Sequence, residues 1–575
     1  MIMSSSDNHN TLKNKKRLFL SLFSSILLVT AIVSIVVGVT SSKNSTESNN
    51  DHQVAHTILK SSCSSTLYPH LCFSALSAVP DATSKIKSKK DVIDLSLNRT
   101  MSATQHSYFK IQKLTSTRRS FTERENTALH DCLVMLNETL DQLSKAYQEL
   151  QDYPSFKKSI SVHADDLKIL LSAAMTNQET CLDGFSHEKA DKKVRELFID
   201  EEMHVYHMSS IALAIIKNVT DTDMAKEQSL SSGRKLEEEN GTEWPEWLSA
   251  GDRRLLQATT VTPNVVVAAD GSGNYRTVSE AVAAAPERSS SRYIIRIKAG
   301  VYRENVDVPR SKTNIMFMGD GRTTTIITAS RNVVDGSTTF NSATVAAVGD
   351  GFLARDITFQ NSAGPSKHQA VAIRVGSDLS AFYRCDMIAY QDTLYVHSLR
   401  QFYVSCIIIG SVDFIFGNAA VVFQNCDIHA RRPNPGQRNM VTAQGRNDPN
   451  ENTGIVIQKC RIGATQDLLA AQSSFRSYLG RPWKLYSRTI IMQTEISDII
   501  DPVGWFEWDG DFALDTLVYR EYQNTGPGAN TANRVNWKGF KVVTSAIEVQ
   551  PFTARNFIGG ANWLPSTGFP YSLDL

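Results

Sequence analysis

The sequence predicts an all-β right-handed parallel β-helix preceded by an all-α four-helix bundle. Apolar residues recur at helical spacing before residue 217, a β-rich phrase recurs after residue 260, and a polar stretch separates the two regions. A chain of 575 residues is also too long for one ordinary domain. We therefore expect two domains, each with its own core.

The overall charge argues against nucleic acid as a partner. The formal net charge is +1, and charged residues make up 21% of the chain. Outside the N-terminus there is no long basic run, and no RNA-binding aromatic motif is present. We therefore expect no nucleic-acid partner.

An uncharged apolar run occupies residues 18–40, directly after a basic N-terminal segment, residues 1–17. The run is long enough to span a bilayer, and its basic flank predicts that residues 1–17 stay in the cytosol. Two interpretations are open: a retained membrane anchor and a cleaved signal peptide. Both direct the rest of the chain into the secretory pathway.

Sequons and cysteines agree with that compartment. Disulfides and N-glycosylation are both expected there, which predicts a disulfide-bonded glycoprotein. The sequons all precede residue 257, at Asn44, Asn98, Asn137, Asn218 and Asn240. The eight cysteines divide evenly between the two regions, as Cys63, Cys72, Cys132 and Cys181 and then Cys385, Cys406, Cys426 and Cys460. This segregation indicates two modules.

Residues 52–217 are expected to form the helical domain. An apolar stripe recurs at steps of four and three along one face, as the core of an antiparallel bundle requires. Its members are Leu129, Leu133, Leu136, Leu140, Leu143, Tyr147 and Leu150. The stripe predicts core packing rather than a binding site. By spacing alone, the four cysteines of this region allow three pairings.

Residues 218–256 lose the helical period and are polar, with Gly and Ser, which predicts a linker. Two basic sequences lie in it, "RKLE" at 234–237 and "RRLL" at 253–256. Both look like sites for subtilisin-type processing proteases, which need an exposed, extended peptide. The alternative is that the basic pairs are simply solvated charge. Cleavage at the second site releases residues 257–575.

The region after residue 260 changes to short β-rich runs with Gly and Asn at the breaks. One exception is "TVSEAVAAAP", where Thr277 and Glu280 predict a capping box for a short helix before Pro286. A phrase then recurs, and its first four occurrences lie about twenty residues apart, which is typical of a solenoid, here most simply a parallel β-helix. It reads "FQNSA" at 359, "FYRCDM" at 382, "FYVSCII" at 402, "FQNCDI" at 423 and "IQKCRI" at 457.

The repeat also stacks the cysteines of this region. Equivalent positions of neighbouring coils lie about 4.8 Å apart. Cys406 and Cys426 fall at nearly the same place in successive coils, and we predict a disulfide between them. The alternative is a stack of free cysteines in the core.

Two aspartates have similar apolar and aromatic surroundings, Asp392 in "YQDTLY" and Asp413 in "GSVDFIFG". They follow Phe382 by ten residues and Phe402 by eleven, so stacking predicts a pair on one face. Two close acids cannot both ionise easily; one becomes a proton donor, and a nearby cation keeps the other charged and nucleophilic. The structural alternative is a turn hydrogen bond for one and an ordinary salt bridge for the other.

Four motifs, "GPSKHQAVAIRVGSD", "YQDTLY", "GSVDFIFG" and "YLGRPW", resemble those of the plant pectin methylesterases (pectinesterases). The resemblance extends from "NVVVAADGSGNY" to "WLPSTGFPYSLDL", nearly all of residues 257–575. It implies hydrolysis of the methyl esters of pectin, with release of methanol, by a protein secreted to the cell wall. It also implies chemistry that needs no metal or cofactor.

The resemblance implies a role for each matching position. Asp413 corresponds to the nucleophile and Asp392 to the general acid and later base. Gln369 and Gln391 match the amides that hold the oxyanion. The remaining matches are Arg481, which binds the nucleophilic carboxylate, Trp483, the aromatic under a sugar ring, and Thr339, a substrate contact.

Other pectin-degrading enzymes and a non-catalytic binding protein explain the same region less well. A lyase on this fold would require a Ca²⁺-binding acidic cluster, and a galacturonase would require acids spaced for glycoside hydrolysis. Neither pattern is evident. A non-catalytic wall-binding protein would be indicated by a change at one of the polar site positions, and all of them are intact.

Residues 52–217 resemble the invertase and pectin methylesterase inhibitor family. That resemblance implies pairing of Cys63 with Cys72 and of Cys132 with Cys181. It also implies a zymogen-like precursor whose pro-region inhibits or retains it, and it makes proteinaceous inhibitors of this class candidate partners.

Overall fold

The computed structural model describes residues 52–117, 121–155, 158–186, 189–231 and 262–575. The segment 1–17, the apolar run 18–40 and both basic sequences of the linker lie outside these ranges, as do Asn44 and Asn240. Within the described part of the chain, no helix is both long and apolar enough to cross a bilayer.

The first of two compact units consists of the residues up to Ser64 together with Pro69–Leu95. Its described part contains a helical stretch over 52–63, α2 (Pro69–Ser77), α3 (Ala82–Lys85) and the start of α4 (Lys89–Thr117). Cys63 and Cys72 are buried and form a disulfide. The first predicted pairing is therefore confirmed.

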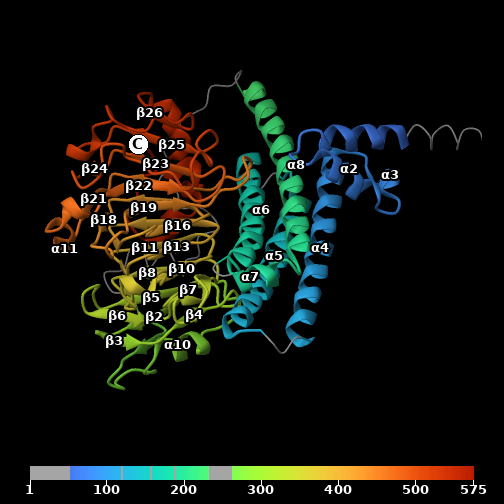
Figure 1. The fold of residues 1–575 in the computed structure, drawn as a ribbon. Coiled ribbons are helices and arrows are strands. Elements are labelled where there is room, and N and C mark those ends of the chain that lie inside the picture. Colours follow the sequence, from blue (N-terminus) through green and yellow to red (C-terminus); the bar gives the residue numbers. More distant parts are fainter. Residues whose placement is uncertain (1–51, 118–120, 156–157, 187–188, 232–261) are drawn as a thin grey trace, which may run out of the picture. The chain divides into compact units, whose positions relative to one another are not determined.

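The second unit consists of Ser65–Tyr68 and Ser96–Leu575, and it begins with the remaining long helices (Figure 1). These are α5 (Glu123–Asp152), α6 (Ile160–Asp183) and α8 (Ile199–Ser231), with the short α7 (Lys189–Arg195) before α8. α6 packs against both α5 and α8. Ser107 of α4 donates to Glu202 of α8, and Lys110 pairs with Glu201. Four long helices thus form the predicted helical domain.

The helix α5 packs as its apolar stripe predicts, and a capping box stabilises its start. Thr122 and Glu125 form a capping box at its first turn. Every second member of the predicted stripe is fully buried, namely Leu129, Leu136, Leu143 and Leu150. A disulfide between Cys132 and Cys181 joins α5 to α6, which confirms the second predicted pairing.

The predicted start of the linker is wrong. The sequence predicts loss of the helix from residue 218, whereas α8 continues to Ser231. The segment between them contains neither Gly nor Pro, so nothing in it breaks a helix. It lacks only an apolar stripe: of its side chains that the structure describes, Thr220 alone is buried.

The rest of the second unit is a parallel β-helix in which each coil contributes strands to three sheets (Figure 1). The 11-stranded sheet contains, in spatial order, β1 (Val265–Val267), β2 (Tyr293–Ile297), β5 (Ile315–Gly319), β8 (Leu353–Arg355), β11 (Ser380–Tyr383), β14 (Arg400–Val404), β17 (Ala420–Gln424), β20 (Gly454–Gln458), β23 (Arg488–Met492), β25 (Val518–Tyr522) and β26 (Phe540–Val543). The eight-stranded sheet contains β3 (Gly300–Arg303), β6 (Thr325–Ala329), β9 (Thr358–Asn361), β12 (Asp386–Ile388), β15 (Ile407–Gly410), β18 (Asp427–Ala430), β21 (Arg461–Ala464) and β24 (Glu495–Ile496). The seven-stranded sheet contains β4 (Val306–Val308), β7 (Val345–Ala347), β10 (Ile373–Val375), β13 (Leu394–Val396), β16 (Ile415–Gly417), β19 (Asn439–Gln444) and β22 (Ser477–Pro482). The predicted fold class is therefore confirmed.

Short helices lie between and after the strands of the β-helix. The helix α10 (Val278–Ala284), between β1 and β2, starts at the predicted capping box of Thr277 and Glu280. The helix α11 (Gln466–Leu469) lies between β21 and β22, whereas α12 (Ala546–Val549) and α13 (Ala554–Phe557) follow β26.

A single left-handed residue bends each coil from the 11-stranded sheet into the eight-stranded one. It is Arg384, Ser405, Asn425, Lys459 and Gln493 in five successive coils, each with φ near 50°. One such residue reverses the chain direction sharply without a long loop. The strands can therefore stay short, and these residues follow one another after 21 and 20 residues and then twice after 34.

The interior is a set of ladders along the coils. Phe382, Tyr403 and Phe423 are in register and stack, with ring centroids 4.6 and 4.7 Å apart. This register corrects the sequence alignment by one residue, because Phe402 pairs with Ala381 instead of Phe382. The phrase "FQNSA" also belongs to another sheet, since Phe359 pairs with Met387.

The predicted disulfide between Cys406 and Cys426 is wrong. All four cysteines of the β-helix, Cys385, Cys406, Cys426 and Cys460, are free and buried. They form one ladder in which each side chain points into the interior in the same direction. The thiols of Cys406 and Cys426 donate to backbone carbonyl oxygens, at 3.5 Å from Phe382 O and 3.6 Å from Tyr403 O. The stack of free cysteines is thus the correct alternative.

Candidate active site

Asp392 and Asp413 occupy equivalent positions in neighbouring coils. Leu394 pairs with Ile415 across β13 and β16, two residues after each aspartate. The backbone N–H of Asp392 donates to Val412 O at 3.0 Å. Both aspartates have a positive φ, 61° and 50°, a left-handed conformation that costs a non-glycine residue about 1–2 kcal/mol. The chain maintains this strain at the two bends that lead into the seven-stranded sheet.

Arg481 holds the carboxylate of Asp413. It lies on β22, and its Nε and Nη2 donate to Oδ1 and Oδ2 of Asp413 at 2.8 and 2.6 Å. The guanidinium also lies over the ring of Trp508, 4.3 Å from the centroid. This two-point geometry matches the planar fork of arginine to a carboxylate.

Asp392 has the opposite environment. Burial raises the pKa of Asp392 well above its ordinary value, and the charge of Asp413 raises it further, while Arg481 acts in the other direction. Only 7% of Asp392 is exposed. The pair therefore consists of one carboxylate fixed by a cation and one carboxyl group that favours its protonated form.

All seven site residues predicted from the sequence line one cavity of about 350 Å³. They are Thr339, Gln369, Gln391, Asp392, Asp413, Arg481 and Trp483. The two glutamines come from bends of neighbouring coils: Gln369 precedes β10, and Gln391 is adjacent to Asp392, with its carbonyl oxygen accepting from Ala370 N at 3.2 Å. Two amides, two carboxyl groups and a guanidinium thus converge on a space large enough for a sugar unit.

Trp483 has room beside the cavity because residue 445 is glycine. A Cβ at Gly445 would come within 3.0 Å of the Trp483 ring. The ring lies 6.0 Å from that of Phe416, centroid to centroid. Gly445, directly after β19, therefore leaves the space that the Trp483 ring occupies.

Comparison with known protein families assigns both halves of the chain. Residues 264–561 match the family model described as Pectinesterase, and residues 57–215 match the model described as Plant invertase/pectin methylesterase inhibitor. The chain belongs to the pectinesterase family. It is a carboxylic ester hydrolase that acts on the methyl esters of pectin.

Similar pectinesterases include full-length and shorter relatives. Pectinesterase 1 of Citrus sinensis is 66% identical over 568 residues, which cover 98% of this chain and 96% of the relative. Pectinesterase/pectinesterase inhibitor U1 of Solanum lycopersicum is 64% identical over 570 residues, 98% of this chain and 97% of the relative. The solved pectin methylesterase from carrot is 75% identical, covers 55% of this chain and 100% of its own, and has a TM-score of 0.55.

Several aromatic residues of the pectinesterase cavity were not predicted from the sequence as site residues. They are Phe340, Tyr395, Phe416 and Trp508. The sequence does contain a signal that could have identified two of these aromatic residues, because Tyr395 and Phe416 each follow a site aspartate by three residues. Their rings stack 4.2 Å apart, centroid to centroid, and form an apolar wall beside the carboxyl pair.

Residues of the inhibitor-family region also line the pectinesterase cavity, which the sequence did not predict residue by residue. They are Asp131 of α5, Thr180 and Asp183 of α6, and Gly184 and Ser186 just after α6. Thr180 Oγ1 lies 3.0 Å from His397 Nε2 and 3.4 Å from the Tyr395 hydroxyl.

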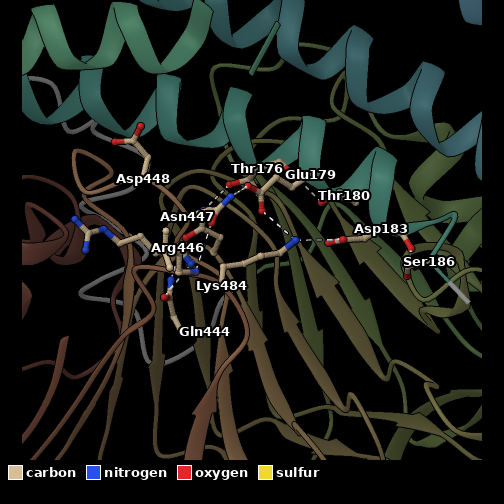
Figure 2. Close-up of polar contacts among 12 residues, drawn as sticks. Thr176, Glu179, Thr180, Asp183, Ser186, Gln444, Arg446, Asn447, Asp448 and Lys484 are labelled. Atoms are coloured by element: carbon tan, nitrogen blue, oxygen red, sulfur yellow. Dashed lines mark hydrogen bonds and ion pairs between the residues drawn. The ribbon is translucent and has the colours of Figure 1, made fainter. Parts of the chain in front are cut away.

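Lys484, next to Trp483, forms one of the ionic contacts with the inhibitor-family region. Its Nζ lies 3.3 Å from Glu179 Oε2 and 3.2 Å from Asp183 Oδ1. Figure 2 shows Lys484 extended between these two acids of α6. Asn447 donates to Glu179, and Ser210 of α8 donates to Asp448 at 2.5 Å. Of these residues, Asp183 also lines the cavity.

Proposed function

We propose that Asp413 is the nucleophile and Asp392 the acid and base of methyl-ester hydrolysis. The observation that carries this assignment is the difference between the two carboxyl groups: Arg481 binds Asp413 through both oxygens, while burial favours protonated Asp392. A carboxyl group that favours its protonated form can donate a proton, whereas a carboxylate held by an arginine presents its oxygens for attack.

In the first step, an oxygen of Asp413 attacks the carbonyl carbon of the galacturonate methyl ester. The carbonyl electrons move to oxygen, and the side-chain amides of Gln369 and Gln391 donate hydrogen bonds to that oxyanion. When the tetrahedral intermediate collapses, the bond to the methoxy oxygen breaks. Asp392 gives its proton to that oxygen, methanol leaves, and an acyl-enzyme anhydride remains on Asp413.

In the second step, water completes the reaction. Asp392, now a carboxylate, takes a proton from water as the water oxygen attacks the galacturonyl carbon. The bond to Asp413 breaks and its electrons return to that carboxylate, which Arg481 again binds. The product is a free galacturonate carboxyl group, and Asp392 regains its proton.

Thr339 and Trp483 contact the polymer in this proposal. Trp483 presents an aromatic face at the cavity, and sugar rings pack their apolar faces on such surfaces. Thr339 lies in the turn before Phe340 and offers a hydroxyl on the same cavity wall.

The inhibitor-family region keeps the precursor inactive. Asp131, Thr180 and Asp183 line the cavity that the methyl ester must enter. Cleavage by a subtilisin-type protease at "RRLL" in the linker separates residues 257–575 from this region. The active enzyme then acts in the cell wall, and separate inhibitors of the same class are further partners.

The decisive experiment compares methanol release with polymer length. Residues 257–575 are incubated with highly methyl-esterified pectin; a solved relative 75% identical to this region consists of it alone, so the region folds independently. Methanol release at constant chain length supports the proposal. Chain shortening without methanol contradicts it.

A further inference from the structure

A second cavity, of about 820 Å³, adjoins the active-site cavity and shares Asp131 and Phe340 with it. One wall comes from α5 and includes Glu138, Asp141 and Lys145. The other wall comes from the early coils of the β-helix and contains four arginines, Arg288, Arg310, Arg331 and Arg374, besides Asp307 and Asp350. The mechanism above uses none of these cations.

Arg374 is the most deeply buried of the four arginines. Only 6% of it is exposed, although it carries a full charge. Its Nε donates to Phe340 O at 3.2 Å, and its guanidinium lies 3.5 Å from the centroid of the Phe340 ring. Its Nη1 is buried and has no hydrogen-bond partner among the described residues. A buried guanidinium nitrogen without a partner is energetically costly, so the α5 wall leaves this cation unsatisfied in the uncut chain.

No carboxylate of the described residues satisfies this cation. Glu138, Asp307 and Asp131 all act on the pKa of Arg374, but no ion pair within 4.0 Å joins any of them to it. Asp131 instead accepts from Thr338 and Asn341. The α5 wall therefore covers Arg374 without neutralising it.

Arg374 lies on the same ladder of the seven-stranded sheet as Arg481. The register runs from Arg374 through Tyr395, Phe416 and Ala443 to Arg481. In-register residues of parallel strands point to the same face, and four strand spacings correspond to about 19 Å. Two arginines thus lie at the ends of a stripe whose middle is the stacked pair Tyr395 and Phe416.

We propose that Arg374, flanked by Arg288, Arg310 and Arg331, binds free carboxylates of the polymer at a distance from the reacting ester. This inference rests on the proposed function, because removal of the α5 wall by processing exposes the arginines. The chemistry fits a chain of sugar acids: aromatic rings face the sugars and a guanidinium fork binds a planar carboxylate. The enzyme then recognises galacturonate units that have already lost their methyl groups.

Binding of fully de-esterified polygalacturonate to residues 257–575 tests this inference by titration calorimetry. Loss of a charge-assisted, two-point contact in Arg374→Gln should raise Kd about tenfold. The matched control is Arg461→Gln, which removes the same charge from the eight-stranded sheet, where Arg461 pairs with Asp427. Its Kd should stay within about twofold of the unmodified enzyme.

The inference is overturned if folded Arg374→Gln binds within about twofold of the unmodified enzyme, or if Arg461→Gln weakens binding equally. If circular dichroism shows that Arg374→Gln does not fold, the double variant Arg310→Gln/Arg331→Gln tests the inference in its place. It should weaken binding at least about threefold, and unchanged Kd contradicts the inference. Because no turnover is measured, failure of the catalytic roles would leave this result unaffected.

Discussion

Arg481 donates two nearly parallel hydrogen bonds to Asp413, from Nε at 2.8 Å and from Nη2 at 2.6 Å. The interaction depends on a planar fork, which lysine lacks. It also places the cation on the side of Asp413 that borders the cavity, beside Trp508. One side chain therefore orients the carboxylate of the proposed nucleophile.

Arg481→Lys in residues 257–575 should lower kcat/KM for methyl-esterified pectin about 10- to 100-fold, because one of two hydrogen bonds to a charged group is lost. Methanol release measures the effect. Arg476→Lys is the matched control, since the Arg476 side chain is mostly exposed just before β22. A loss in Arg481→Lys no larger than in the control would contradict the orienting role.

Asp413→Asn should abolish methanol release, because an amide cannot attack the ester. Asp392→Asn should lower the rate about 10²- to 10⁴-fold, the usual contribution of general acid and base catalysis. Only Asp392→Asn can accumulate an acyl-enzyme, since Asp413 is still present and deacylation is slow. Mass spectrometry of the quenched enzyme detects that adduct. Near-normal turnover in both folded variants would show that the carboxyl pair is structural.

Glu179→Gln/Asp183→Asn in the uncut chain should raise its activity. The double change leaves Lys484 without its two acidic partners, and breaking a buried ion pair is strongly unfavourable. We expect methanol release from the precursor to increase at least about tenfold. Asp152→Asn, an exposed change at the end of α5, is the control and should have no effect. Equal rates for both precursors would refute occlusion by this contact.

Removal of the disulfide between α5 and α6 should destabilise the helical domain. Cys132→Ala/Cys181→Ala opens a loop with a sequence separation of 49, which corresponds to about 4 kcal/mol in the chain-entropy model. Cys63→Ala/Cys72→Ala opens one with a separation of 9 and should cost less, about 2.5 kcal/mol. Urea unfolding followed by helical circular dichroism gives both values. The reverse order would contradict the loop-length explanation.

Glu138→Gln should make the uncut chain more stable at neutral pH. Burial raises the pKa of Glu138 from 4.5 to about 7, so folding favours the protonated group. The contribution of Glu138 to the stability of the folded state is complete below pH 4.5 and is lost as the pH rises to about 7. The glutamine does not ionise and avoids this loss, which amounts to about 3 kcal/mol. Melting temperatures of both proteins should agree at low pH and diverge above it; parallel curves would contradict the assignment.

The carboxyl pair was predictable from the sequence. In a repeating coil, residues that are one repeat apart in the sequence lie next to each other in space. Asp392 and Asp413 keep the same distance from Cys385 and Cys406, and those cysteines are in register. The phrase starting at Phe359 misled the alignment, since similar letters occur on strands of different sheets. Register depends on which residues bend each coil, and a left-handed φ at Arg384 or Ser405 has no reliable sequence signal.

The boundary of the cavity could not be predicted in the same way. Its helical side comes from residues such as Thr180, which meet Tyr395 and His397 more than two hundred positions along the chain. No periodicity links such distant positions. A family resemblance indicates that an inhibitor-like region is present, but not which of its side chains face the aspartates.

The two halves of the protein differ in whether their folding involves the oxidation of cysteines. Both disulfides lie in the helical region, while Cys385, Cys406, Cys426 and Cys460 remain thiols inside the β-helix. Burial raises the pKa of the Cys406 and Cys426 thiols, which keeps them unreactive. The catalytic half can therefore mature without an oxidant, whereas its regulator needs one. A reducing cytosol should accordingly yield the ester hydrolase on its own more readily than the intact precursor.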